Sequence, residues 1–184
     1  YQAILSRASR NKEIIQASSL RLLRSSSAAM PVATIEALEN AFQCPVIEAY
    51  GMTEASHQMA SNFLDIIRKP GSVGKSAGPE IALFRDNKLI NVTNTVGEIV
   101  IRGLNVTKGY KNNNKANKEN FFDGWFKTGD LGKFDEDGFL FISGRIKEII
   151  NKGGEKISPQ EVDEALMKHE AVFHAVCCSV KSEK

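Results

Sequence analysis

The sequence predicts an α/β protein with added α+β elements, and three patterns carry this prediction. Residues 31–42 place apolar side chains at helical spacing, and the apolar run from Cys44 to Ile47 is typical of a short buried strand. Between residues 81 and 110, short β-type runs are separated by turns rich in asparagine, aspartate and glycine. A further helix signal comes at residues 158–161, so helices and strands are mixed along the chain.

The first part of the chain precedes the predicted helix and buried strand. The apolar residues among positions 14–23 suggest a helix followed by a strand. The small residues 25–29 either let a ligand approach the backbone closely, as glycine would, or form a plain serine loop. The predicted helix 31–42 begins with proline, and its core-facing stripe at i, i+3 and i+7 is Ile35, Leu38 and Phe42.

The next stretch, Glu48-Ala49-Tyr50-Gly51-Met52-Thr53-Glu54, reads as a turn built on one glycine. It presents an aromatic face, a hydroxyl and a carboxylate where a strand ends, which is where open α/β sheets bind ligands. Tyr50 suits a nucleobase, Thr53 a phosphate oxygen, and Glu54 the magnesium that accompanies ATP. The alternative is a strand-to-helix turn with polar residues at its surface.

The middle of the chain has β-type runs at residues 81–84, 88–92 and 97–102. They predict a small antiparallel barrel over residues 81–110. The following residues 111–120 are rich in asparagine and lysine, and they predict an exposed loop or a frayed helix.

The last part of the chain begins with a hairpin signal at residues 133–141, which carry Asp-Gly at the turn. Residues 158–161, Ser-Pro-Gln-Glu, predict a capping box. The helix that it begins is expected to face Val162, Ala165 and Leu166 inward. Residues 171–180 predict a further strand.

Two later motifs join the Tyr50–Glu54 stretch: Trp-Phe-Lys-Thr-Gly-Asp at residues 125–130 and Gly-Arg-Ile-Lys-Glu at residues 144–148. In this order, the three motifs resemble the core motifs of the adenylate-forming superfamily, which includes acyl-CoA synthetases, luciferases and peptide-synthetase adenylation domains. The resemblance implies that residues 1–146 are the C-terminal portion of the large AMP-binding domain, sheet portion plus small β-barrel. Residues 147–184 would be the hinge and an incomplete small C-terminal α+β domain.

The resemblance also implies a nucleotide site. Asp130 would bind both ribose hydroxyls, and Arg145 would donate to ribose or phosphate oxygens. Ala49 would offer its backbone carbonyl to the adenine amine, Tyr50 would complete the nucleoside clamp, and Thr53 would bind the α-phosphate. The alternative for Asp130 is a turn-forming aspartate beside glycine.

Four further residues are candidates, and the first three take their roles from the same resemblance. Lys147 occupies the hinge position, with a surface lysine as the alternative. Gly154 lies in a loop that would approach the CoA pantetheine, with a plain hairpin turn as the alternative. Ser27 would line the acyl pocket. His57, which follows Glu54 by three residues, either holds an acidic substrate or is a structural histidine.

The activity implied is that of an acid-CoA ligase, which uses ATP, Mg²⁺ and CoA and treats Thr53, Glu54 and Lys147 as catalytic residues. The run Thr53 to Met59 is similar to the oxalate-CoA ligase branch, which favours a short polar acid. Two alternatives stay open: a non-catalytic AMP-binding module and a peptide-synthetase adenylation domain. The family's phosphate loop and C-terminal lysine are not in this sequence, so we expect an internal piece that is inactive on its own.

Composition limits the partners. Twenty-four basic and 22 acidic residues give a net charge of +2, which is too balanced to indicate a nucleic-acid partner. No apolar run approaches the roughly 20 residues of a transmembrane segment. The odd cysteine count, with Cys177 beside Cys178, is typical of reduced thiols and predicts an intracellular protein, cytoplasmic or peroxisomal. The sequence carries no signal for an oligomeric state.

Overall fold

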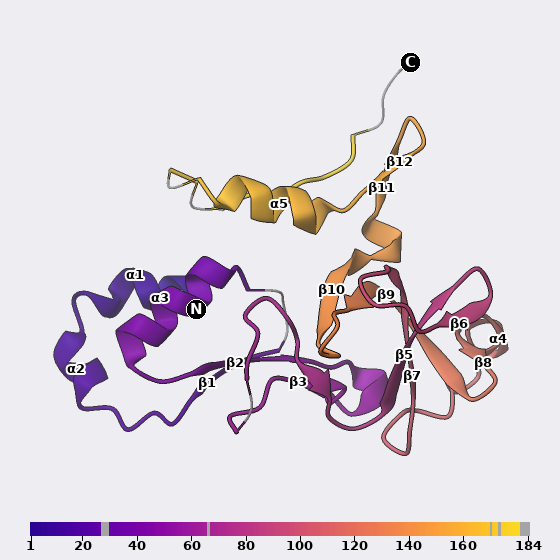
Figure 1. The fold of residues 1–184 in the computed structure, drawn as a ribbon, viewed down its shortest axis with the longest axis horizontal. Helices are drawn as coiled ribbons and strands as arrows, with labels where there is room; N and C mark the ends of the chain where they lie inside the picture. Colours follow the sequence, from indigo (N-terminus) through magenta and orange to yellow (C-terminus); the bar gives the residue numbers. More distant parts are fainter. Residues whose placement is uncertain (27–29, 66, 170, 173, 181–184) are drawn as a thin grey trace.

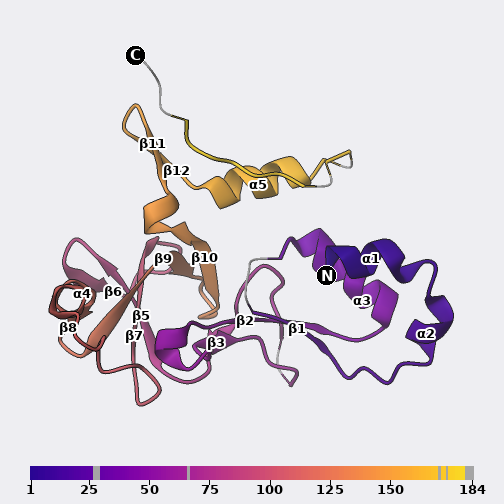
Figure 2. The ribbon, with the colours of Figure 1, turned by 180° about the vertical axis from the view of Figure 1, so that it is seen from behind.

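The structure is a computed structural model that describes residues 1–26, 30–65, 67–169, 171–172 and 174–180. Its strands form a mixed sheet, an antiparallel sheet and a separate hairpin. Figures 1 and 2 show α1, α2 and α3 beside β1 and β2 at one end of the molecule, and the antiparallel sheet at the other. This mixture confirms the predicted α/β fold class.

The mixed sheet has the order β1-β2-β3-β4, with β1 parallel to β2 and the other pairs antiparallel. Helix α3 packs beside it through Ile35 and Leu38, which are 1% and 0% exposed and contact Val46. The predicted helical stripe is therefore part of the core. The elements of this region are α1 (Gln2–Ala8), α2 (Lys12–Gln16), β1 (Leu23–Ser25), α3 (Val32–Phe42), β2 (Val46–Tyr50), β3 (Ala60–Ser61) and β4 (Lys75–Ser76).

The antiparallel sheet has the order β10-β9-β7-β5-β6, and β8 pairs with β9. Its strands are β5 (Glu80–Arg85), β6 (Lys88–Ile90), β7 (Gly97–Arg102), β8 (Phe121–Phe122), β9 (Trp125–Phe134) and β10 (Leu140–Arg145). The three strands predicted over 81–110 are present, but the sheet continues to Arg145. Three strands are too few to close a barrel. In the described part of the chain, β6 and β10 end the strand order, so the sheet curls without closing.

One hydrophobic cluster joins the two sheets. Tyr50, Met59 and Ala60 from the first sheet region pack with residues of the second, among them Leu83, Ile99, Ile101, Phe126 and Leu140. The shared core fixes the ends of β2 and β9 relative to each other.

The predicted loop or frayed helix contains α4 (Asn114–Asn120), where the Asn113 side chain accepts a hydrogen bond from the Ala116 N–H.

The chain then passes through η2 (Ile146–Glu148) to a hairpin of β11 (Ile150–Lys152) and β12 (Glu155–Ile157) and to α5 (Pro159–Met167). The predicted helix is present, but the capping box is wrong: the Ser158 hydroxyl donates to the Ser143 carbonyl at 2.7 Å instead. Ala165 and Leu166 are exposed, against the prediction that they face inward. No described residue from 171 to 180 lies in a strand, so that prediction is also wrong.

Candidate nucleotide site

Strand β2 brings the first motif to the junction of the two sheets. Ala49 and Tyr50 pair with Ser61 and Ala60 of β3, and all five residues of β2 are buried. The turn therefore begins at Gly51, later than predicted, because pairing with β3 extends the strand through Tyr50. Tyr50 is a core residue and only 8% exposed, so it offers no open ring face for stacking. Its hydroxyl is the part that can form a polar contact.

The turn after β2 folds back on itself. A Cβ at Gly51 would lie 2.3 Å from the His57 carbonyl oxygen, so only glycine allows this close approach. Ser56 and His57 both have left-handed backbone angles, with φ of 53° and 56°. The result is that His57 Nε2 lies 3.5 Å from Thr53 Oγ1, with both residues exposed. The structure thus brings these two predicted site residues together at the surface.

Asp130 on β9 connects the three motifs. Its carboxylate accepts the Tyr50 hydroxyl at 2.5 Å and Arg145 Nε at 2.8 Å, and β10 places Arg145 opposite Asp130. Asp130 is 6% exposed, whereas the Arg145 side chain is 54% exposed. Burial, together with the Asp130 charge, raises the pKa of Tyr50, and the hydrogen bond and charge of Asp130 raise the pKa of Arg145. Tyr50 is therefore a hydrogen-bond donor and Arg145 a cation at neutral pH.

Two residues that the sequence did not indicate hold Asp130 in place. Thr128 Oγ1 donates to the Ile99 carbonyl at 2.8 Å and accepts from the Asp130 N–H at 3.1 Å. Glu98 Oε1 accepts from the Gly129 N–H at 3.2 Å, and burial raises the pKa of Glu98. The only hint in the sequence was that a threonine precedes Asp130 by two residues, which is the spacing of a local side-chain-to-backbone bond.

Glu54 is held by the loop that follows β7 of the antiparallel sheet. The Tyr110 hydroxyl donates to Glu54 Oε1 at 2.8 Å, and the Thr107 N–H donates to the Glu54 carbonyl at 2.7 Å. Burial raises the pKa of Tyr110 to about 12, with a further contribution from the hydrogen bond to Glu54 and the charge of Glu54. The phenol therefore keeps its proton at neutral pH. No group of three metal-binding side chains occurs among the described residues. A single carboxylate fits Mg²⁺ that is bound mainly by nucleotide phosphates.

The remaining predicted residues lie elsewhere. Lys147 is exposed in η2, and Gly154 follows Gly153 in the β11–β12 turn with φ of 92° and 61°, as a two-residue turn requires. Over the described ranges, no hydrogen bond or ion pair joins Lys147 or Gly154 to Asp130. Ser27 lies outside the described residues.

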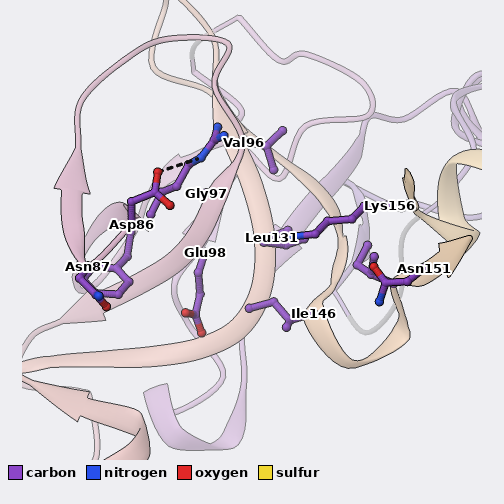
Figure 3. A pocket seen from close by; sticks show the side chains of 12 residues that line it. Asp86, Asn87, Val96, Gly97, Glu98, Leu131, Ile146, Asn151 and Lys156 are labelled. Atoms are coloured by element: carbon purple, nitrogen blue, oxygen red, sulfur yellow. Dashed lines mark ion pairs between the residues drawn. The ribbon is translucent and has the colours of Figure 1, made fainter. Parts of the chain in front are cut away.

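A groove of about 610 Å³ lies on the other side of β9 (Figure 3). The groove is lined by Leu131, Ile146, Asn151 and Lys156 and by the β5–β6 turn. In that turn Arg85 Nε lies 3.6 Å from Asp86 Oδ2. Successive residues of a strand point to opposite faces, so Leu131 faces the groove and Asp130 faces away. The groove therefore lies on the opposite face of β9 from the Asp130 carboxylate, although Glu98, which accepts from the Gly129 N–H, also lines it.

The two sheets and the ordered motifs that they carry define a fold of the adenylate-forming class. The chain belongs to the AMP-binding enzyme family, whose model matches residues 1–111. A sequence comparison finds 54% identity over 167 residues with an oxalate-CoA ligase of Arabidopsis thaliana, covering 90% of this chain and 32% of the relative. An oxalate-CoA ligase of Saccharomyces cerevisiae is 51% identical over 167 residues, covering 89% and 31%. The chain spans about a third of the length of these curated relatives.

Solved structures agree with this assignment. The o-succinylbenzoate CoA synthetase from Bacillus subtilis, in complex with its acyl-adenylate intermediate, matches with a TM-score of 0.83 and 34% identity over 99% of this chain and 37% of that one. The same enzyme in complex with ATP and magnesium matches with a TM-score of 0.79 and 30% identity, over 98% and 42%. None of the helices among the described residues combines the length and the hydrophobicity of a membrane-spanning segment.

Proposed function

We propose that this chain supplies the nucleotide site of an AMP-forming acid-CoA ligase. The observation that carries the proposal is the junction of Tyr50, Asp130 and Arg145, which belong to three separate motifs and meet around one buried carboxylate. An acceptor-only carboxylate suits the two hydroxyls of a ribose. Residues 1–146 would form the large-domain part, and residues 147–184 would begin the small domain, with Lys147 as the hinge.

The reaction has two steps. The carboxylate of the acid attacks the α-phosphorus of ATP, which gives an acyl-adenylate and pyrophosphate. The CoA thiol then attacks the acyl carbonyl and releases AMP. Positioning and charge neutralisation carry most of such phosphoryl chemistry.

Each residue of the site has a role in this scheme. Asp130 holds the ribose, with Tyr50 and Arg145 fixing its carboxylate. Thr53 donates to the α-phosphate and Ala49 offers its carbonyl to the adenine amine. Glu54 would bind Mg²⁺, which neutralises phosphate charge when it is present. After the hinge at Lys147 turns, the Gly154 loop would approach the pantetheine arm of CoA.

We further propose a short polar acid such as oxalate as the substrate. His57 supports this, because its imidazole is exposed beside Thr53 and can bind a second carboxylate. The names of the relatives agree only in part, since they include a sulfoacetate-CoA ligase of Cupriavidus necator at 45% identity and a 2-succinylbenzoate-CoA ligase of Bacillus licheniformis at 40%. Free thiols at Cys44, Cys177 and Cys178 support an intracellular site of action, cytoplasmic or peroxisomal.

ATP–pyrophosphate exchange tests this proposal. The complete product of the gene that encodes this chain is assayed with oxalate, malonate, acetate, coumarate and octanoate. We expect exchange with oxalate, and we expect His57→Ala to raise the KM for oxalate at least about tenfold while the exposed control His169→Ala leaves it unchanged. Exchange with only aromatic or long-chain acids would remove the role of His57. No exchange with any acid would favour a non-catalytic AMP-binding module.

A further inference from the structure

The loop from residue 103 to residue 110 sets the backbone of the turn that carries Glu54. Asn105 Nδ2 donates to the carbonyls of Ala55 at 3.0 Å and Gln58 at 2.8 Å. The Thr107 N–H donates to the Glu54 carbonyl at 2.7 Å. The loop follows β7 of the antiparallel sheet, and the turn follows β2 of the mixed sheet. A loop that leaves the antiparallel sheet therefore fixes a turn that leaves the mixed sheet.

Tyr110 extends this control to the Glu54 side chain. Its hydroxyl donates to Glu54 Oε1 at 2.8 Å. Its ring packs against the shared core and lies edge-on to Phe126, with centroids 6.4 Å apart. Asn117 holds its backbone from both sides, accepting from the Tyr110 N–H at 2.7 Å and donating to the Tyr110 carbonyl at 3.0 Å. Ring and backbone are both fixed, so the position of the hydroxyl is fixed as well.

A carboxylate held in this way offers its two oxygens unequally to a cation, because the oxygen that accepts the phenol hydrogen bond has less lone-pair capacity left. Oε1 is engaged by the phenol, and no described residue donates a hydrogen bond to Oε2. Mg²⁺ demands near-octahedral geometry and takes carboxylates through single oxygens, whereas the larger Ca²⁺ accepts both oxygens of one carboxylate. Hydrogen-bond partners of metal ligands commonly change metal affinity about 10- to 100-fold.

We propose that Tyr110 is a positioning residue that favours one-oxygen binding of Glu54 to the cation on a bound nucleotide, and so selects Mg²⁺ over Ca²⁺. This rests on the proposed function, because it needs Glu54 to meet that cation. Tyr110 itself touches neither cation nor nucleotide in this scheme. Its removal should therefore alter metal preference more than nucleotide binding.

The test is calorimetric titration of Mg²⁺ and of Ca²⁺ into the complete gene product with a saturating ATP analogue whose α,β-bridge is methylene, corrected for metal binding to the analogue alone. Tyr110→Phe keeps the ring and removes only the hydroxyl. We expect the Kd for Mg²⁺ to rise at least about tenfold and the Kd for Ca²⁺ to stay the same or fall. Tyr1→Phe is the matched control, since its hydroxyl donates to the Arg24 carbonyl at an exposed site.

Each other outcome is decisive. Equal weakening of Mg²⁺, Ca²⁺ and analogue binding would show a merely structural role and overturn the inference, as would no change. Tyr110→Phe should also have no effect on Mg²⁺ affinity in a Glu54→Gln background; an effect there would mean that Tyr110 does not act through Glu54. A wild-type protein that binds no metal–nucleotide complex would overturn the proposed function itself, before any variant is compared.

Discussion

Removing the Asp130 carboxylate should destabilise the chain even without a ligand. Asp130→Ala leaves the buried Tyr50 hydroxyl without its acceptor, and an unpaired buried donor costs about 1–3 kcal/mol. The bond to Arg145 adds less than about 1 kcal/mol, because the guanidinium is 54% exposed and well solvated. We therefore expect the free energy of unfolding to fall by about 1–4 kcal/mol.

Urea denaturation followed by tryptophan fluorescence measures this change, because Trp125 is the single tryptophan and is 6% exposed. Glu119→Ala is the control: its ion pair with Lys115 is 3.9 Å long and exposed, so the expected loss is below about 1 kcal/mol. In a Tyr50→Phe background, Asp130→Ala should cost at least about 1 kcal/mol less than in the wild type. Equal losses for Asp130→Ala and Glu119→Ala, or strict additivity with Tyr50→Phe, would refute this account of the buried pair.

Two further predictions concern stability. Burial raises the pKa of Glu48 from 4.5 to about 7, against a hydrogen bond from the Gly71 N–H, so between these values the folded chain holds a proton that the unfolded chain has lost. The free energy of unfolding should therefore fall, by up to about 3 kcal/mol in total, as pH rises from 4.5 to about 7, and level off above that. Glu48→Gln should abolish this fall in urea titrations. Gly74→Ala should prevent folding, because its Cβ would overlap Ser61 backbone atoms, and circular dichroism would show the loss of structure. The control Gly138→Ala has φ of 77° and no atom within 4 Å of its Cβ, so it should lower the free energy of unfolding by only about 1–2 kcal/mol.

The sequence predicted local features well where one short segment determines them. The stripe of Ile35 and Leu38 predicted α3, which the structure contains, and the predicted turn at residues 153 and 154 is present, with positive φ at both glycines. The capping box failed because Ser158 bonds to Ser143, a partner that no local pattern specifies. A hydroxyl with two possible partners takes the one that the tertiary structure supplies.

The candidate site was predicted from the motifs and only partly from physical patterns in the sequence. Asp130 and Arg145 lie together as the motifs implied, yet the burial of Tyr50 was missed because it depends on pairing with β3. Thr128 and Tyr110 were missed for a related reason: each acts through a contact across sheets or strands, at 2.8 Å in both cases. Residues that position other residues leave little trace in a single sequence.

A bulge in β10 connects the site to the part of the chain that follows it. Ile142 pairs with Gly132, but Gly144 pairs with Leu131, so Ser143 is an extra residue in β10. In the earlier register Arg145 would lie opposite Gly129; the extra residue shifts it by one position to face Asp130.

The same extra residue, Ser143, also forms a hydrogen bond with the start of α5. The Ser143 carbonyl accepts the Ser158 hydroxyl at the start of α5, and a Cβ at Gly144, where φ is 131°, would lie 2.9 Å from that hydroxyl oxygen. One bulge thus determines both the register that places Arg145 opposite Asp130 and the position at which α5 packs against β10. Because a one-residue slip moves every side chain of a strand to the other face, loss of this bulge would separate Arg145 from Asp130 and displace α5 together. The placement of the arginine and the docking of the last helix are therefore a single structural feature of β10.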